Sequence, residues 1–210
     1  MSITTTDSNT TAPTQFLRGR NETYAYRRFG SGLGHPLLFL QHFTGTLDNW
    51  DPAVTDPLAL GREIILFDSA GVGQSTGKVP TTIAGMASHA LDFLDGLGLD
   101  ICDVLGFSLG GMVAQQMAQE RPSIFRRMIL VGTAPRGGEE IMHLEKPSLA
   151  RHLGDPALKG YAVLQKLFFA PTPSSQTAGG AFVERLAQRK VDLDPADRSG
   201  RCRRTDGGVP

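Results

Sequence analysis

The sequence predicts an α/β fold, in which a mostly parallel sheet is flanked by helices on both faces. Four short blocks are apolar without alternation, which is typical of strands covered on both sides. They are Leu37–Leu40, Ile64–Phe67, Val104–Phe107 and Met128–Val131. Segments with apolar residues at helical spacing lie between the later blocks, so strand and helix alternate as in a doubly wound arrangement.

Composition is consistent with one soluble domain. The 210 residues are 40% hydrophobic, enough for a core. Lys and Arg together number 21, as do Asp and Glu, which argues against nucleic acid or an anionic membrane as a general partner. Because no signal peptide or membrane-spanning run is apparent, we expect a cytoplasmic protein. Cys102 starts an apolar block and Cys202 lies in an Arg-rich stretch, so no disulfide is expected.

The chain before the first apolar block is predicted to contain a leader and a hairpin. Residues 1–14 are rich in Thr and Ser and predict a disordered leader. Residues 15–138 are expected to form the core. Its first part, Phe16–Arg20 and Thr23–Phe29, alternates weakly and predicts a hairpin. A Gly-rich loop follows at Gly30–Gly34.

Two helices are predicted within the core. An apolar stripe from Ile83 to Leu97 marks the first, which stops near Gly96 and Gly98. The second runs from about Leu109 to Glu120, and Pro122 marks its end. Its inward side is expected to carry Met112, Val113, Gln116 and Met117.

The last third of the chain has a different character. Residues 139–190 read as helical pieces interrupted by Gly and Pro, which fits a helical cap over the sheet and equally fits ordinary peripheral helices. Residues 191–210 are predicted to be a disordered tail. The stretch from Asp197 to Pro210 has few core-forming residues and resembles an out-of-frame translation, a hypothesis that the coding DNA would test.

The candidate nucleophile is Ser108, in Gly106-Phe107-Ser108-Leu109-Gly110. The Gly-x-Ser-x-Gly pattern alone is weak, but here it follows an apolar strand and opens a helix, as a nucleophile elbow does. Gly106 and Gly110 leave room for strand and helix to approach closely. The helix N-terminus directs backbone N–H groups at the site. The alternative is a Gly-rich turn with an incidental serine.

With three further features, this motif resembles the α/β-hydrolase family, specifically its single-domain esterase and cofactor-free perhydrolase-like branch. The other features are the loop Leu40–Gly45, the turn Asp68–Ser75 and the pair of helices around the elbow. The resemblance covers about residues 16–190 and implies the α/β-hydrolase fold with a cap segment. Gln41 and His42 depart from the family pattern, which has His and Gly there, so the side chain of His42 is expected to crowd the loop or contact substrate.

The resemblance implies an oxyanion hole made by the backbone N–H groups of Phe43 and Leu109. It also implies that Asp68 is a structural turn residue, an interpretation favoured over a catalytic one. The glycines near residues 71–77 match neither nucleotide-binding fingerprint. No cofactor and no metal ion are therefore expected, and the expected partner is a small ester-like substrate.

The base and the acid of a catalytic triad are not identifiable. In the family, the chain order is Ser, then Asp or Glu, then His. Only His143 and His152 follow Ser108, and Glu139 and Glu140 are weak candidates for the acid. The strands expected after the cap are missing as well. We therefore expect a C-terminally truncated chain, with apolar surface exposed near Met128–Val131 and aggregation at modest concentration.

These observations favour a serine hydrolase of small carboxylic esters or lactones, inactive or weakly active as this chain. A perhydrolase activity would be a variant of the same site. The alternatives are a non-catalytic binding protein of the same fold and a fragment without function. The substrate and the oligomeric state are not determined by the sequence.

Overall fold

The computed structural model describes residues 7–138 and 160–195. Six strands form one sheet in the order β1-β2-β4-β3-β5-β6. The strands are β1 (Gln15–Arg18), β2 (Thr23–Gly30), β3 (Leu37–Leu40), β4 (Glu63–Phe67), β5 (Cys102–Phe107) and β6 (Phe125–Val131). The pairs β1–β2 and β2–β4 are antiparallel, and the pairs among β4, β3, β5 and β6 are parallel. The predicted α/β class, mostly parallel sheet and hairpin are therefore confirmed.

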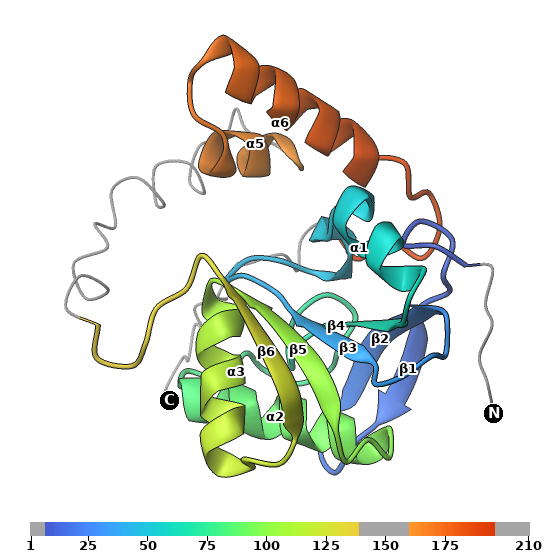
Figure 1. Ribbon diagram of the computed structural model, residues 1–210, viewed down its shortest axis with the longest axis vertical. Helices are drawn as coiled ribbons and strands as arrows, with labels where there is room; N and C mark the ends of the chain where they lie inside the picture. The colour runs from blue at the N-terminus through green and yellow to red at the C-terminus, as the bar shows by residue number, and fades with distance from the viewer. Residues whose placement is uncertain (1–6, 139–159, 196–210) are drawn as a thin grey trace, which may run out of the picture.

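Helices cover both faces of the sheet (Figure 1). They are α1 (Pro52–Ala59), α2 (Ile83–Gly96) and α3 (Leu109–Glu120), with a short 3-10 turn, η1 (Leu47–Asn49), before α1. One apolar core fills the face under α2 and α3, and a second lies on the face of α1. The buried strands β3 and β4 contribute to both cores because their successive side chains point to opposite faces.

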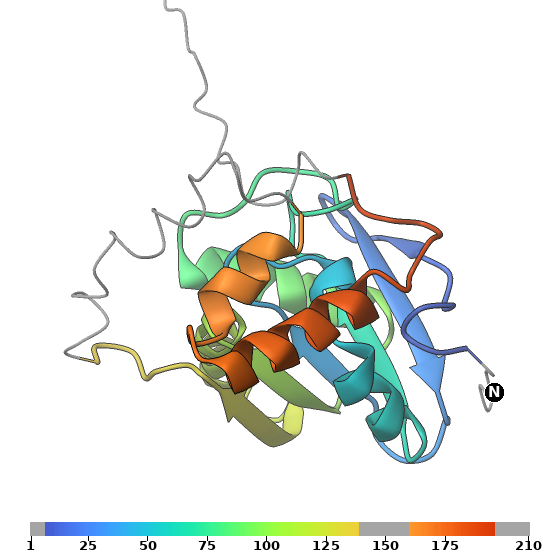
Figure 2. The same cartoon turned by 90° about the horizontal axis from the view of Figure 1, so that it is seen from above.

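Two further helices lie over one end of the sheet, as the view from above shows (Figure 2). They are α5 (Ala162–Phe168) and α6 (Pro173–Leu186). Arg185 of α6 binds both carboxylate oxygens of Asp51, which caps α1, at 2.7 and 2.8 Å. Residues 160–190 of the segment interpreted as a cap thus lie above the sheet, and residues 139–159 lie outside the described residues.

Two ends that the sequence predicts to be disordered are ordered where the structure describes them. The Asn9 side chain is buried and donates to Trp50 O and to Thr55 Oγ1 at 3.1 and 2.9 Å. Asp194 N donates to Asp48 Oδ2 at 2.7 Å. The structure therefore differs from the prediction of disorder at residues 7–14 and 191–195. Partners distant in sequence satisfy polar groups in both segments.

Helix α1 has no counterpart among the sequence predictions, since Pro57 interrupts its short apolar pattern. Helix α3 has the predicted bounds, but its inward side differs in one respect. Ala114 is buried, whereas Gln116 donates to Glu120 Oε1 on the exposed surface. The predicted inward position of Gln116 is wrong.

Strand β6 is the outermost strand of the described sheet and exposes apolar side chains. Ile129, Leu130 and Val131 are 43–44% exposed. This matches the apolar surface expected near Met128–Val131. The edge of β6 that faces away from β5 has no paired strand within residues 7–138 and 160–195.

Candidate active site

Ser108 lies on the turn between β5 and α3 and has an unusual backbone conformation. Its backbone has φ 53° and ψ −117°, and in the described ranges only Asp192 is another non-glycine residue with positive φ. The turn is fixed on both sides, since Ser108 N donates to Val131 O and Gly111 N donates to Ser108 O, each at 2.9 Å. Such backbone strain costs about 1–3 kcal/mol and is concentrated at functional sites.

Glycines let strand and helix meet at this turn. A Cβ on Gly106 would lie 2.6 Å from Gly111 Cα, and one on Gly110 would strike the carbonyl of Leu40. A Cβ on Gly111 would lie 2.5 Å from Thr133 Cγ2. The close approach expected from the motif is therefore present, and it brings the N-terminus of α3 against the end of β3.

The loop after β3 supplies the second side of the site. His42 N donates to the side-chain Oε1 of Gln41, and Gly45 N donates to His42 O, both at 3.0 Å. Phe43 lies at the tip of this turn and is 59% exposed. No group in the described ranges accepts a hydrogen bond from the backbone N–H of Phe43 or Leu109, and both residues line one cavity.

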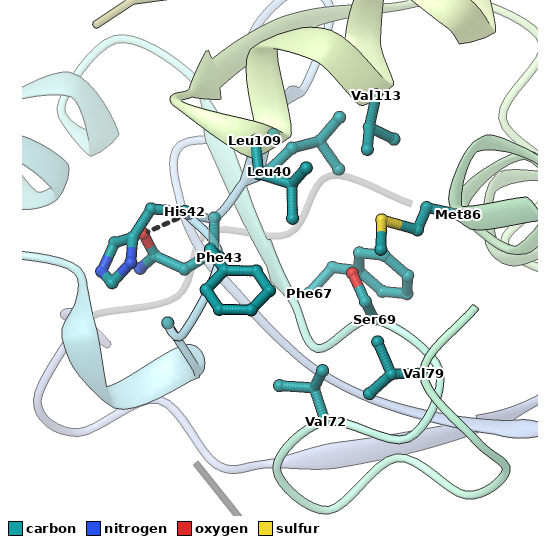
Figure 3. A pocket seen from close by; sticks show the side chains of 13 residues that line it. Leu40, His42, Phe43, Phe67, Ser69, Val72, Val79, Met86, Leu109 and Val113 are labelled. Atoms are coloured by element: carbon teal, nitrogen blue, oxygen red, sulfur yellow. Dashed lines mark hydrogen bonds between the residues drawn. The ribbon is translucent and has the colours of Figure 1, made fainter. Parts of the chain in front are cut away.

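His42 turns its ring away from this cavity (Figure 3) and towards two aromatic rings. It packs edge-on against Phe107 and Phe168, with ring centroids 5.4 and 5.2 Å away. Burial lowers the pKa of His42 to about 4. The ring is therefore neutral at pH 7 and a weak base. The His42 side chain, which was expected to crowd the loop, thus packs the loop against Phe107 at the end of β5 and Phe168 at the end of α5.

Asp68 lies buried at the end of β4 and organises the neighbouring loops. Its Oδ1 accepts from Leu47 N at 2.9 Å, and its backbone oxygen accepts from Ser75 Oγ at 2.8 Å. Burial, and next the carboxylate of Asp194, raise the pKa of Asp68 well above its usual range. These contacts match the structural interpretation of Asp68.

The described part of the chain shows no base that is hydrogen-bonded to Ser108. No side chain there hydrogen-bonds to the Ser108 hydroxyl. His89 lies on α2, where its Nδ1 is 2.8 Å from the hydroxyl of Tyr24. His143 and His152, and the acid candidates Glu139 and Glu140, lie outside the described residues.

Residues 7–138 and 160–195 lack two further features. They contain no group of three His, Cys, Asp or Glu side chains arranged to hold a metal ion. Within the same ranges, no helix has the length and apolar character to cross a bilayer. Burial, and next Asp103, raise the pKa of Cys102 to about 12, as suits the core residue that the sequence predicts.

Phe43 and Leu109 line the cavity as residues that the sequence singled out, whereas Phe67, Ser69 and Met86 of its wall had no predicted role in the site. The cavity has a volume of about 50 Å³ and lies beside the loop of Phe43 (Figure 3). Its side-chain walls come mainly from Leu40, Phe43, Phe67, Ser69, Val72, Val79, Met86, Leu109 and Val113. The position of Ser69 offered a signal, because ligands of α/β sheets bind beyond the carboxyl ends of the strands and Ser69 follows β4 by two residues.

Comparison with known proteins agrees with this arrangement. The sequence profile of the alpha/beta hydrolase fold matches residues 35–178. An alpha/beta hydrolase fold protein from Chitinophaga pinensis has a similar structure, with a TM-score of 0.84 and 40% identity over 92% of this chain and 70% of that one.

Curated relatives match over shorter stretches. The dihydrolipoyllysine-residue acetyltransferase component of the acetoin cleaving system of Cupriavidus necator is 38% identical over 107 residues, which are 50% of this chain and 28% of that protein. Several bacterial proteins are named as RutD carbamate hydrolases. The one from Pseudomonas savastanoi pv. phaseolicola is 31% identical over 98 residues, which are 46% of this chain and 38% of that protein. The chain thus spans well under two thirds of the length of these relatives.

Proposed function

This chain belongs to the alpha/beta hydrolase fold family, and on that premise we propose that Ser108 is the nucleophile of a serine hydrolase acting on small carboxylic esters or lactones. The observation that carries the proposal is the strained backbone of Ser108, with φ 53°, between β5 and α3. A serine held in this way costs stability and presents its hydroxyl at a helix N-terminus.

The chemistry follows from the groups around Ser108. Its Oγ attacks the carbonyl carbon of the substrate, and the carbonyl oxygen becomes an oxyanion. The free N–H groups of Phe43 and Leu109 would stabilise that charge, each contributing about 10²–10³ in rate. The C–O bond to the alcohol then breaks, and the alcohol leaves with a proton from the base. Water hydrolyses the acyl-serine and releases the acid.

The base determines how fast this reaction runs. A serine hydroxyl without a base stays protonated and is a poor nucleophile. Oxyanion binding alone leaves roughly 10³–10⁴ over the rate in water. His143 and His152 stay candidates for the base. The low pKa of His42, about 4, argues against it in this role.

The test is covalent labelling with a fluorophosphonate, read by intact mass and peptide mapping. We expect one adduct on Ser108 that Ser108→Ala abolishes. Ser88→Ala is the matched control, because Ser88 is exposed on α2 and should leave labelling unchanged. An adduct that persists in Ser108→Ala would overturn the assignment.

A folded protein without any adduct would favour the second candidate, a non-catalytic binding protein of the same fold. The observation behind this candidate is that the Ser108 hydroxyl has no hydrogen-bonding partner among residues 7–138 and 160–195. Circular dichroism of the unlabelled protein would establish that it is folded.

A further inference from the structure

The cavity beside Phe43 is small. Its volume is about 50 Å³. On the scale on which one water molecule needs roughly 10–15 Å³, this space holds about three to five non-hydrogen atoms. It therefore suits a propyl-sized group, whereas a long alkyl chain would have to extend beyond it.

Two residues that line the cavity connect it to the position of the reacting carbonyl, although Ser108 itself is not among the lining residues. Phe43 and Leu109, whose backbone N–H groups have no acceptor in the described ranges, both line it. Leu109 follows Ser108 directly, and the first turn of α3 lies against Leu40, which also lines the cavity. A carbonyl whose oxygen lies between the two N–H groups would direct one substituent into this space.

The walls are apolar except at one point. Phe67, Met86 and Val113 form much of the surface, and Phe67 and Val113 are largely buried. Ser69 lies among them, between Phe67, Met86 and Val79 (Figure 3). No residue in the described ranges hydrogen-bonds to the Ser69 hydroxyl, whereas the nearby Ser75 hydroxyl donates to Asp68 O at 2.8 Å. Ser69 is thus free to bind an oxygen atom of a ligand.

We propose that this cavity is the acyl subsite and that it selects short hydroxyacyl groups, whose hydroxyl oxygen hydrogen-bonds to Ser69. This inference rests on the proposed function of Ser108. A 3-hydroxybutyryl group fits the space, because beyond its carbonyl it has four non-hydrogen atoms. An octanoyl group has seven and does not fit.

The experiment measures acylation of the full chain by p-nitrophenyl 3-hydroxybutyrate, butyrate and octanoate, from p-nitrophenolate release and the mass of the acyl adduct. We expect acylation by butyrate at least tenfold faster than by octanoate, and by 3-hydroxybutyrate about three- to tenfold faster than by butyrate. Faster acylation by octanoate than by butyrate would overturn the size limit.

Two variants separate the size of the cavity from its hydrogen bond. Val113→Ala enlarges the cavity and should raise the octanoate-to-butyrate ratio about tenfold. Ser69→Ala should lower the 3-hydroxybutyrate-to-butyrate ratio about three- to tenfold, and Ser88→Ala should leave both ratios unchanged. A 3-hydroxybutyrate preference that survives Ser69→Ala would refute the role of Ser69.

Labelling distinguishes failure of this inference from failure of the proposed function. A fluorophosphonate adduct on Ser108 together with a preference for octanoate would overturn the subsite and leave the nucleophile in place. The absence of both the adduct and the acyl-serine would overturn the function and the subsite together.

Discussion

At the scale of single residues, Ser108 combines an unfavourable backbone with a free side chain. Its φ of 53° lies where a Cβ is disfavoured, and neighbours on both sides hold the turn in place through Val131 O and Gly111 N. The strained backbone thus lowers the stability of the fold at the residue that is the proposed nucleophile.

This strain predicts an unusual order of stabilities. Ser108→Gly removes the Cβ and relieves the strain, whereas Ser108→Ala keeps the Cβ and the strain. We expect the glycine variant to have the higher free energy of unfolding, by about 1 kcal/mol after the extra backbone entropy of glycine is counted. Urea denaturation followed by circular dichroism measures the difference. An alanine variant as stable as the glycine variant would show that the turn is unstrained.

At the scale of secondary-structure elements, the site depends on how closely β5 and α3 pack. Gly106 and Gly111 meet backbone to backbone, and Gly111 also meets Thr133 in the segment after β6. Three segments therefore converge behind Ser108 with no space for a side chain.

Adding one methyl group at this junction should be costly. We expect Gly106→Ala to lower the free energy of unfolding by about 2 kcal/mol or more, because its Cβ would lie 2.6 Å from Gly111 Cα. Gly180→Ala on α6 is the matched control, since no atom lies within 4 Å of the added Cβ. There, the higher helix propensity of alanine should raise stability by up to about 1 kcal/mol. Thermal denaturation of both variants checks this; equal stabilities would contradict it.

Some secondary-structure elements could be predicted from the sequence and others could not. The strands were predictable because β3 and β4 are continuously apolar and fully buried. The elbow was predictable because its glycines follow a local rule. Helix α1 was not, because Pro57 breaks its short apolar pattern. Nor was the binding of Arg185 to Asp51, which joins residues 134 positions apart and leaves no local pattern.

At the scale of the whole molecule, a buried group of charges joins segments from both ends of the described chain. Arg27 on β2 is fully buried and binds Asp48 Oδ1 at 2.8 Å. Its Nη2 also donates to Asp192 O at 2.8 Å. The carboxyl groups of Asp68 and Asp194 lie close enough beside this pair to act on one another electrostatically. An isolated buried charge is costly, so removing one of these charged side chains should destabilise the fold by leaving its partner buried and unpaired.

The raised pKa of Asp68 makes stability depend on pH. Burial, and next the carboxylate of Asp194, raise the pKa of Asp68 in the folded protein. Between the ordinary carboxyl pKa near 4 and this raised value, the folded state binds more protons than the unfolded state, so stability falls as pH rises. Asp68→Asn cannot ionise at this position and should lack the part of the dependence that Asp68 contributes.

The measurement is the free energy of unfolding of the wild type minus that of Asp68→Asn, from urea titrations between pH 4.5 and pH 8. We expect this difference to fall as pH rises, by at most about 1.4 kcal/mol per pH unit. Contributions of groups that do not interact with Asp68 largely cancel in the subtraction, whereas that of Asp194 does not, because the two carboxyl groups act on one another. A difference that stays constant or rises would contradict the raised pKa of Asp68.

The guanidinium group of Arg189 has a consequence for synthesis of the protein. It donates to Asn9 O and to Ala12 O, each at 2.9 Å, and is almost wholly buried. The turn at Asn9–Ala12 thus has carbonyl acceptors whose donor is translated some 180 residues later. Chains generally fold from the N-terminus as they emerge. We therefore expect the bonds from Arg189 to form last at this turn, after the Asn9 side chain has already bound Trp50 and Thr55.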